Sequence, residues 1–212
     1  EAAHRAGIEV QVLDIHDGEL EPTLENRKKI TRLIREWQAD MVFAHRPWDY
    51  HPDHRYTGVL VQDAAFMVSV PFICPDTPPL KKHPVFFYFG DRFTKPYPFE
   101  PDVAVSIDDV FDEKLHVVDA LESQVYEGGA LAGPAVLIKR KADNPEARKK
   151  ILRASWSKRQ GRIADKHRDE LIEWYGEAAG RAVKHAEAFE ICEYGHQPSK
   201  TELKILFPFL GK

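Results

Sequence analysis

The apolar positions of the first 70 residues change their spacing along the chain. Residues 8–15 alternate between apolar and polar side chains, which predicts a strand. Residues 24–37 place their apolar side chains on one helical stripe, and Thr23 before them is a typical helix N-cap. Residues 41–44 (MVFA) form a wholly apolar run, as in a buried parallel strand. This order of strand, helix and strand predicts a right-handed crossover unit.

A second helix is predicted after this apolar run. Residues 51–70 are apolar around much of the helical circumference, which indicates a largely buried helix. Pro52 suits the first helical position, because its missing N–H costs nothing there. His51 is then the N-cap and His54 the third residue inside the helix. Both imidazoles are therefore expected near the end of the 41–44 strand.

The rest of the chain continues to alternate between element types. The predicted elements are strands at 84–89 and 103–107, a helix at 111–126, a loop at 128–135, one or two helices within 144–186, and a last strand at 188–194. This alternation predicts the α/β class with an open, mostly parallel sheet. With 212 residues and 43% hydrophobic content, the chain is expected to form a single domain over residues 1–212.

The charge balance argues against a nucleic-acid partner. The net charge is −4, whereas a surface that follows phosphates normally carries a basic excess. The basic run at 139–141 and the Arg- and Lys-rich segment at 148–162 are interleaved with acids, which indicates a solvated helix face.

Cysteine use and hydropathy favour a cytoplasmic protein. Cys74 and Cys192 have no metal-ligand or redox spacing, which fits structural thiols in a reducing compartment. No run approaches the roughly 18 apolar residues of a membrane span. The chain begins at Glu1, and residues 1–7 read as the end of a helix, so we expect a further segment upstream.

The stretch RPWDYHPDHRYTG carries the candidate chemistry. It follows a predicted strand at the carboxyl end, where open α/β sheets place their functional crevice. Residues i and i+3 are neighbours on a helix, so His51 and His54 can face one cavity, and histidine is a common zinc ligand. Asp49 or Asp53 could orient an imidazole through its second nitrogen.

Each of these side chains also has a simpler interpretation. His51 and His54 could be exposed or capping residues, and Trp48 and Tyr50 could pack the loop rather than stack on a ligand. His45 could support the site from behind the ligands or merely be polar at the strand's exit. His196 near the C-terminus could fold over the site as a lid; otherwise the remaining histidines are expected to be surface or locally bonded residues.

The motif DYHPDH after MVFAH resembles the second motif of the PIG-L/LmbE-like family of zinc-dependent N-deacetylases. The order of RAGIE, DGEL, a helix and the motif strand follows that family, and KLHVVDALESQ resembles a later family helix, so the resemblance covers roughly residues 1–125. It implies a Rossmann-like three-layer fold and hydrolysis of an acetamide on an amino sugar or glycoconjugate. By position, His54 matches the zinc ligand, His51 the histidine that stabilises the oxyanion or protonates the amine, and Asp53 their partner.

Two departures from the family pattern leave a second function open. The family's first motif, AHPDDE, supplies two further ligands and the base, and it occurs nowhere in these residues, so we expect it and its strand upstream of Glu1. Leu121 stands where many members carry a histidine. The alternative is a non-catalytic carbohydrate-binding or interaction protein on the same scaffold. A homo-oligomer is possible under either interpretation, and no nucleotide-binding or serine-nucleophile motif appears.

Overall fold

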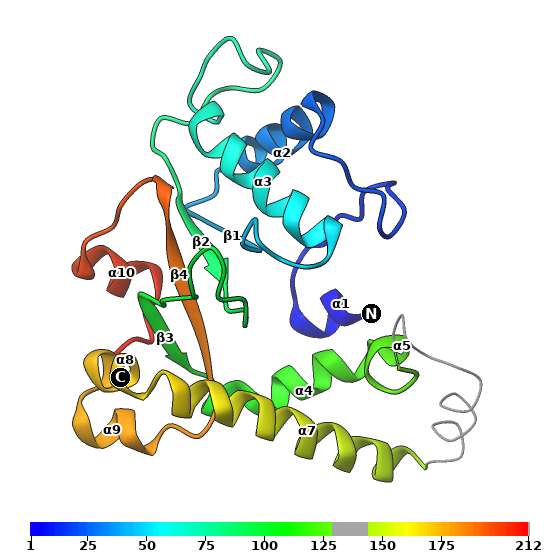
Figure 1. Ribbon diagram of the computed structural model, residues 1–212, viewed down its shortest axis with the longest axis vertical. Helices are drawn as coiled ribbons and strands as arrows, with labels where there is room; N and C mark the ends of the chain where they lie inside the picture. Colours follow the sequence, from blue (N-terminus) through cyan, green and yellow to red (C-terminus); the bar gives the residue numbers. More distant parts are fainter. Residues whose placement is uncertain (129–143, 212) are drawn as a thin grey trace.

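The computed structural model describes residues 1–128 and 144–211 (Figure 1). The predicted loop at 128–135, apart from its first residue, and the basic run at 139–141 lie outside the described residues. None of the described helices is both long and apolar enough to span a membrane.

A four-stranded sheet forms the centre of the described chain. Its strands are β1 (Met41–Ala44), β2 (Val85–Phe89), β3 (Val103–Ser106) and β4 (Ala186–Gly195), in the order β1-β2-β4-β3. β1 and β2 are parallel, but β4 is antiparallel to both of its neighbours. The expectation of a mostly parallel sheet is therefore not confirmed, because the last strand enters between β2 and β3 in the opposite direction.

Helices cover both faces of this sheet (Figure 1). On one face, α2 (Leu24–Glu36) and α3 (Pro52–Met67) pack over Phe86 and Tyr88. On the other face, α4 (Phe111–Asp119), α7 (Pro145–Lys166), α8 (Arg168–Tyr175) and α10 (Lys200–Leu206) contribute to a core with Val85 and Phe87. Successive side chains of β2 therefore point to opposite faces of the sheet and pack into two separate cores, as the pleat of a strand requires.

The N-terminal strand prediction is wrong in the described structure. Residues 8–13 have no regular secondary structure, and Ile8, Val10 and Val12 are 64%, 69% and 88% exposed. An alternating pattern favours a strand, but a strand also needs a partner for its backbone groups. The described sheet gives this segment no such partner.

Two helix predictions need smaller corrections. The helix expected at 111–126 is interrupted at Ala120 and Leu121, where α4 ends and α5 (Glu122–Val125) begins. The segment predicted as one or two helices contains three, α7, α8 and α9 (Glu177–Ala182), and its last residue already belongs to β4. The short α1 (Ala2–Ala6) packs on α4 through Arg5, which donates to the His116 carbonyl at 2.7 Å.

A buried arginine fixes the end of α3 against α2. Arg35 is 1% exposed, and its guanidinium donates to six backbone carbonyls in the segment 67–77. Four of these carbonyls also accept a backbone N–H, so the guanidinium adds bonds that tie the turns after α3 to α2. They hold the C-terminal end of α3 in place, at the opposite end from the first turn with His51 and His54.

Candidate metal and substrate site

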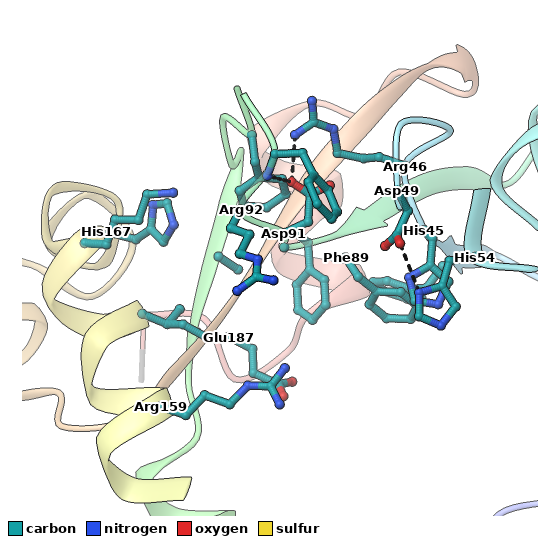
Figure 2. Close-up of a pocket in the computed structure, with 18 of the residues that line it drawn as sticks. His45, Arg46, Asp49, His54, Phe89, Asp91, Arg92, Arg159, His167 and Glu187 are labelled. Carbon is teal, nitrogen blue, oxygen red and sulfur yellow. Dashed lines mark hydrogen bonds and ion pairs between the residues drawn. The ribbon is translucent and has the colours of Figure 1, made fainter. Parts of the chain in front are cut away.

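A cavity of about 890 Å³ opens at the carboxyl ends of β1 and β2. Its walls come from the loop after β1, the first turn of α3, the loop after β2, one side of α7 and the start of β4 (Figure 2). Ligand pockets typically measure about 300–1,000 Å³, so this cavity has room for a ligand of several rings. The position agrees with the rule for open α/β sheets.

The sequence motif folds as predicted at the start of α3. His51 is the N-cap, its ring Nδ1 accepts the backbone N–H of Asp53 at 3.3 Å, and Pro52 occupies the first helical position. Gly58, about two turns after His51, lets the helix lie directly on the loop after β1. A Cβ at this position would come within 2.5 Å of the His45 carbonyl oxygen.

Asp49, His54 and His45 meet at one end of the cavity (Figure 2). The carboxylate of Asp49 lies 3.3 Å from Nδ1 of His54 and also accepts the backbone N–H of His51 at 2.9 Å. The rings of His45 and His54 stack with centroids 4.1 Å apart and planes 9° apart. Burial, followed by the neighbouring His54, lowers the pKa of His45, which keeps this ring neutral.

Asp53 contacts a different part of the chain from the one expected. Its carboxylate accepts the backbone N–H groups of Gly18 and Leu20, at 2.7 and 3.1 Å, and the Gly18 bond lowers the pKa of Asp53. Nε2 of His51 lies 3.8 Å from Asp17 on the same loop. In this structure the Asp53 carboxylate therefore anchors the loop at residues 17–20 beside His51, and no hydrogen bond joins it to either imidazole of the motif.

The two aromatic residues of the motif have different surroundings. Tyr50 lines the cavity, is 70% exposed, and lies edge-on to the rings of His51 and His54. Trp48 packs edge-on against Tyr97, with centroids 5.7 Å apart, and is not among the cavity-lining residues of the described chain. Trp48 thus packs within the loops, whereas the ring of Tyr50 is exposed at the cavity.

Sequence reasoning missed a buried ion pair beside this end of the cavity. Arg46 donates to Asp91 at 3.2 Å and to the Tyr97 carbonyl at 2.5 Å. Burial raises the pKa of Asp91, whose Oδ2 is buried without a hydrogen-bond partner in the described structure. Asp91 lies two residues after the end of β2, separated from it by Gly90. The rule that places functional residues at strand ends, which located the histidines, could therefore also have located this carboxylate.

The opposite wall is formed by α7 and the residue after it, and none of its side chains was predicted to lie at a site. Arg159, Gln160, Lys166 and His167 line this wall. Gln160 is 3% exposed and its Oε1 has no partner in the described structure. His167, expected to be a surface or locally bonded residue, is buried, and burial lowers its pKa.

Two further residues singled out from the sequence lie away from the cavity. His196 bonds Glu202 of α10 at 2.9 Å and is not among the described lining residues, which does not support a lid role. Leu121 is 44% exposed between α4 and α5 and is likewise not among them.

The donor set at the motif end suits a divalent metal ion. His45, Asp49 and His54 each offer one ligand atom, and these atoms all lie within 4.8 Å of one another. Metal-binding histidines commonly give their second ring nitrogen to a carboxylate, and the contact between Asp49 and His54 Nδ1 has this form. Nε2 of His54 then remains available. Asp17, His51 and Asp53 form a second, more exposed group of the same kind.

Comparisons with known proteins agree with the motif. Residues 1–65 match the family model described as PIG-L, GlcNAc-PI de-N-acetylase. The chain is 32% identical over 126 residues to diacetylchitobiose deacetylase of Thermococcus kodakarensis, a match that covers 56% of this chain and 44% of that protein. The match thus spans less than half the length of this curated relative. Together these findings confirm the family resemblance.

Solved structures share the fold over most of the chain. An N,N'-diacetylchitobiose deacetylase from Pyrococcus horikoshii matches with a TM-score of 0.60 and 23% identity, covering 95% of this chain and 65% of that one. A conserved protein of Thermus thermophilus matches with a TM-score of 0.61 and 20% identity, covering 94% and 72%. The 4-carboxy-2-hydroxymuconate hydratase of Pseudomonas putida matches with 0.59 and 18%, covering 93% and 70%. At these identities the likeness concerns the fold alone.

Proposed function

We propose, from the premise that residues 1–65 match the PIG-L family model, that the complete protein is a metal-dependent N-deacetylase. Its substrate would be an acetylated amino sugar or glycoconjugate, and its metal zinc. The observation that carries the proposal is the contact of His54 Nδ1 with buried Asp49 at the end of a cavity of about 890 Å³. This contact orients an imidazole whose other nitrogen can bind a metal.

The residues at this end divide the chemical roles among them. His54 would hold the metal, with His45 and Asp49 in reach and the remaining ligands and the base coming from the family's first motif, which the chain lacks. A divalent metal supplies Lewis-acid polarisation of an amide carbonyl. His51 lies beside His54, with ring centroids 4.8 Å apart, and would hold the proton that the departing amine requires.

Two supports keep His51 in position for this role. Its backbone N–H is bound by Asp49, and its ring Nδ1 accepts the backbone N–H of Asp53. The ring therefore presents Nε2, rather than Nδ1, to a reacting group. Asp53, proposed as a catalytic partner, would act by holding the loop at residues 17–20 against this histidine.

The complete fold and cellular setting are part of the same proposal. We propose a Rossmann-like three-layer domain, since helices cover both faces of the described sheet. Cys74 and Cys192 are both free and buried, which favours a cytoplasmic protein.

Metal content and turnover of histidine variants test the assignment in the complete protein. His54→Ala is expected to lose both metal and activity, whereas His51→Ala keeps the metal but turns over roughly a hundredfold more slowly, as loss of a proton-transfer group implies. His116→Ala, an exposed histidine on α4, is the matched control and should change neither quantity. Equal metal loss in His51→Ala and His54→Ala would mean that the roles are wrongly divided.

A non-catalytic carbohydrate-binding protein is the second candidate, because the first motif does not occur in the chain. A complete protein that contains AHPDDE and releases acetate from N-acetylglucosamine or diacetylchitobiose supports the enzyme. A complete protein without the motif, which binds these sugars and releases no acetate, supports the binding protein.

A further inference from the structure

The cavity has a positively charged wall that the proposed deacetylation does not use. Arg92 after β2 and Arg159 and Lys166 on α7 all line the cavity. The chain as a whole carries a net charge of −4, so these cations concentrate on one surface of an acidic protein. Clefts lined by one sign of charge attract ligands of the opposite sign.

The acidic side chains of the same cavity already have partners. Asp49 contacts His54, Asp91 is paired with Arg46, and Glu187 is paired with Lys114. Lys166 also acts electrostatically on Asp91, so the excess positive charge of the wall rests on Arg92 and Arg159.

Arg92, Arg159 and Lys166 form no ion pair with any residue of the described chain. The guanidinium carbon of Arg159 lies 5.3 Å from the centroid of the Trp156 ring. Figure 2 shows Arg92 and Arg159 on the side of the cavity away from His54, with Glu187 drawn beside the tip of Arg159.

A buried acceptor lies on the same wall. Gln160 is 3% exposed, lines the cavity, and leaves its Oε1 without a partner in the described structure. An unpartnered buried oxygen costs about 1–3 kcal/mol, and this one has almost no accessible surface in the empty cavity. The donors that the wall offers to an anion are therefore its exposed cations, with Gln160 packed beside them.

We propose that this wall, defined by Arg92, Arg159, Gln160 and Lys166, binds an anionic substituent of the substrate, a carboxylate or a phosphate monoester. The proposal rests on the proposed deacetylase function and refines its substrate: an acidic amino sugar whose acetamide lies at His54 and whose charged group lies at α7. Arg92 and Arg159 would bind the anion directly, because guanidinium groups match its planar or tetrahedral oxygens in pairs.

Selectivity of the complete protein tests this assignment. The ratio of kcat/KM on N-acetylglucosamine 6-phosphate to that on N-acetylglucosamine is expected to fall about tenfold in Arg159→Gln and in Arg92→Gln, since one charged hydrogen bond contributes about this factor. N-acetylmuramic acid provides the carboxylate arm. Whichever acidic sugar shows the larger fall identifies the bound group. Arg159→Lys, which keeps the charge, should recover part of the ratio.

Arg162→Gln is the matched control, because Arg162 is an exposed arginine three residues along α7 that does not line the cavity. Its selectivity ratio should equal that of the unchanged protein. A ratio that falls as much in Arg162→Gln as in Arg159→Gln, or that falls in neither Arg159→Gln nor Arg92→Gln, overturns the proposal.

Calorimetric binding of glucosamine and glucosamine 6-phosphate separates this inference from the proposed activity. Tighter binding of the phosphorylated sugar that is lost in Arg159→Gln supports the anion wall even if no acetate is ever released. Equal binding of the two sugars by the unchanged protein overturns the wall even if the protein proves to be a deacetylase.

Discussion

Replacing Gly58 by alanine should destabilise the protein, although the same change usually stabilises a helix. Gly58 lies inside α3, where alanine is favoured over glycine by about 0.5–1 kcal/mol. Its added Cβ, however, would lie 2.5 Å from the His45 carbonyl oxygen and 3.1 Å from the Pro47 nitrogen. All of the nearest atoms belong to the backbone, so no side chain can rotate away.

The magnitude follows from the displacement that this contact requires. Carbon and carbonyl oxygen normally approach to about 3.3 Å, so α3 and the loop after β1 must separate by roughly 0.8 Å. Overpacking of this kind costs about 1–3 kcal/mol, which exceeds the gain in helix propensity. We expect a net loss of about 1–2 kcal/mol in the free energy of unfolding. Metal retention should also weaken, because the separation moves His45 away from His54.

Gly161→Ala on α7 is the matched control, since its Cβ would be 3.5 Å from the Lys184 carbonyl oxygen, an ordinary contact. This variant should gain about 0.5–1 kcal/mol. Urea unfolding of the complete protein, followed by circular dichroism, measures both changes with the metal removed. If Gly58→Ala is as stable as Gly161→Ala, the close approach of α3 to the loop does not hold the site and the reasoning fails.

Three further predictions concern other parts of the molecule. Arg35→Lys should lower the free energy of unfolding by about 3 kcal/mol, measured by urea titration, because three ammonium protons cannot replace the bonds of a buried guanidinium to six backbone carbonyls; an unchanged midpoint would contradict this. Tyr50→Ala should raise KM severalfold while the melting temperature changes little, since this ring is 70% exposed; the opposite result would assign it to loop packing. A hydrogen bond from the Ser199 backbone N–H lowers the pKa of Glu202 from its ordinary 4.5 to about 2, and a second hydrogen bond from His196 adds to this effect. Glu202 should therefore stabilise the fold above about pH 4.5 and lose this effect as the pH falls toward 2, so melting curves of Glu202→Gln should converge with those of the unchanged protein in that window.

The elements predicted best from the sequence are those whose signals are local. Thr23 caps α2, His51 caps α3, and the apolar runs at 41–44 and 84–89 become β1 and β2. A cap, a proline at the first helical position and a short apolar run each depend on a few neighbouring residues. These local signals give the same prediction however the rest of the chain folds.

The failures concern partners that are distant in sequence. Residues 8–13 alternate like a strand but pair with no strand of the described sheet, because alternation specifies the faces of a strand and not its neighbour. The direction of β4 was missed for the same reason. A run of apolar residues reads identically in a parallel and an antiparallel pair, and only the return of the chain from α9 decides which is formed.

The two ends of the cavity illustrate the same contrast in chemical terms. At the motif end, Asp49, His51 and His54 lie within six residues of one another. The carboxylate of Asp49 contacts both His51 and His54, so the spacing alone predicts that the three residues meet. At the α7 end, Arg92 and Arg159 are 67 positions apart in sequence, and only the packing of α7 beside β4 brings them to one surface. Groups that must meet with atomic precision thus come from one rigid strand-to-helix junction. Groups proposed to attract an anion through charge tolerate looser placement, because Coulomb attraction falls off only gradually with distance. Variants of the motif should therefore affect chemistry on every substrate, whereas variants of Arg92 and Arg159 should mainly change which substrates are preferred.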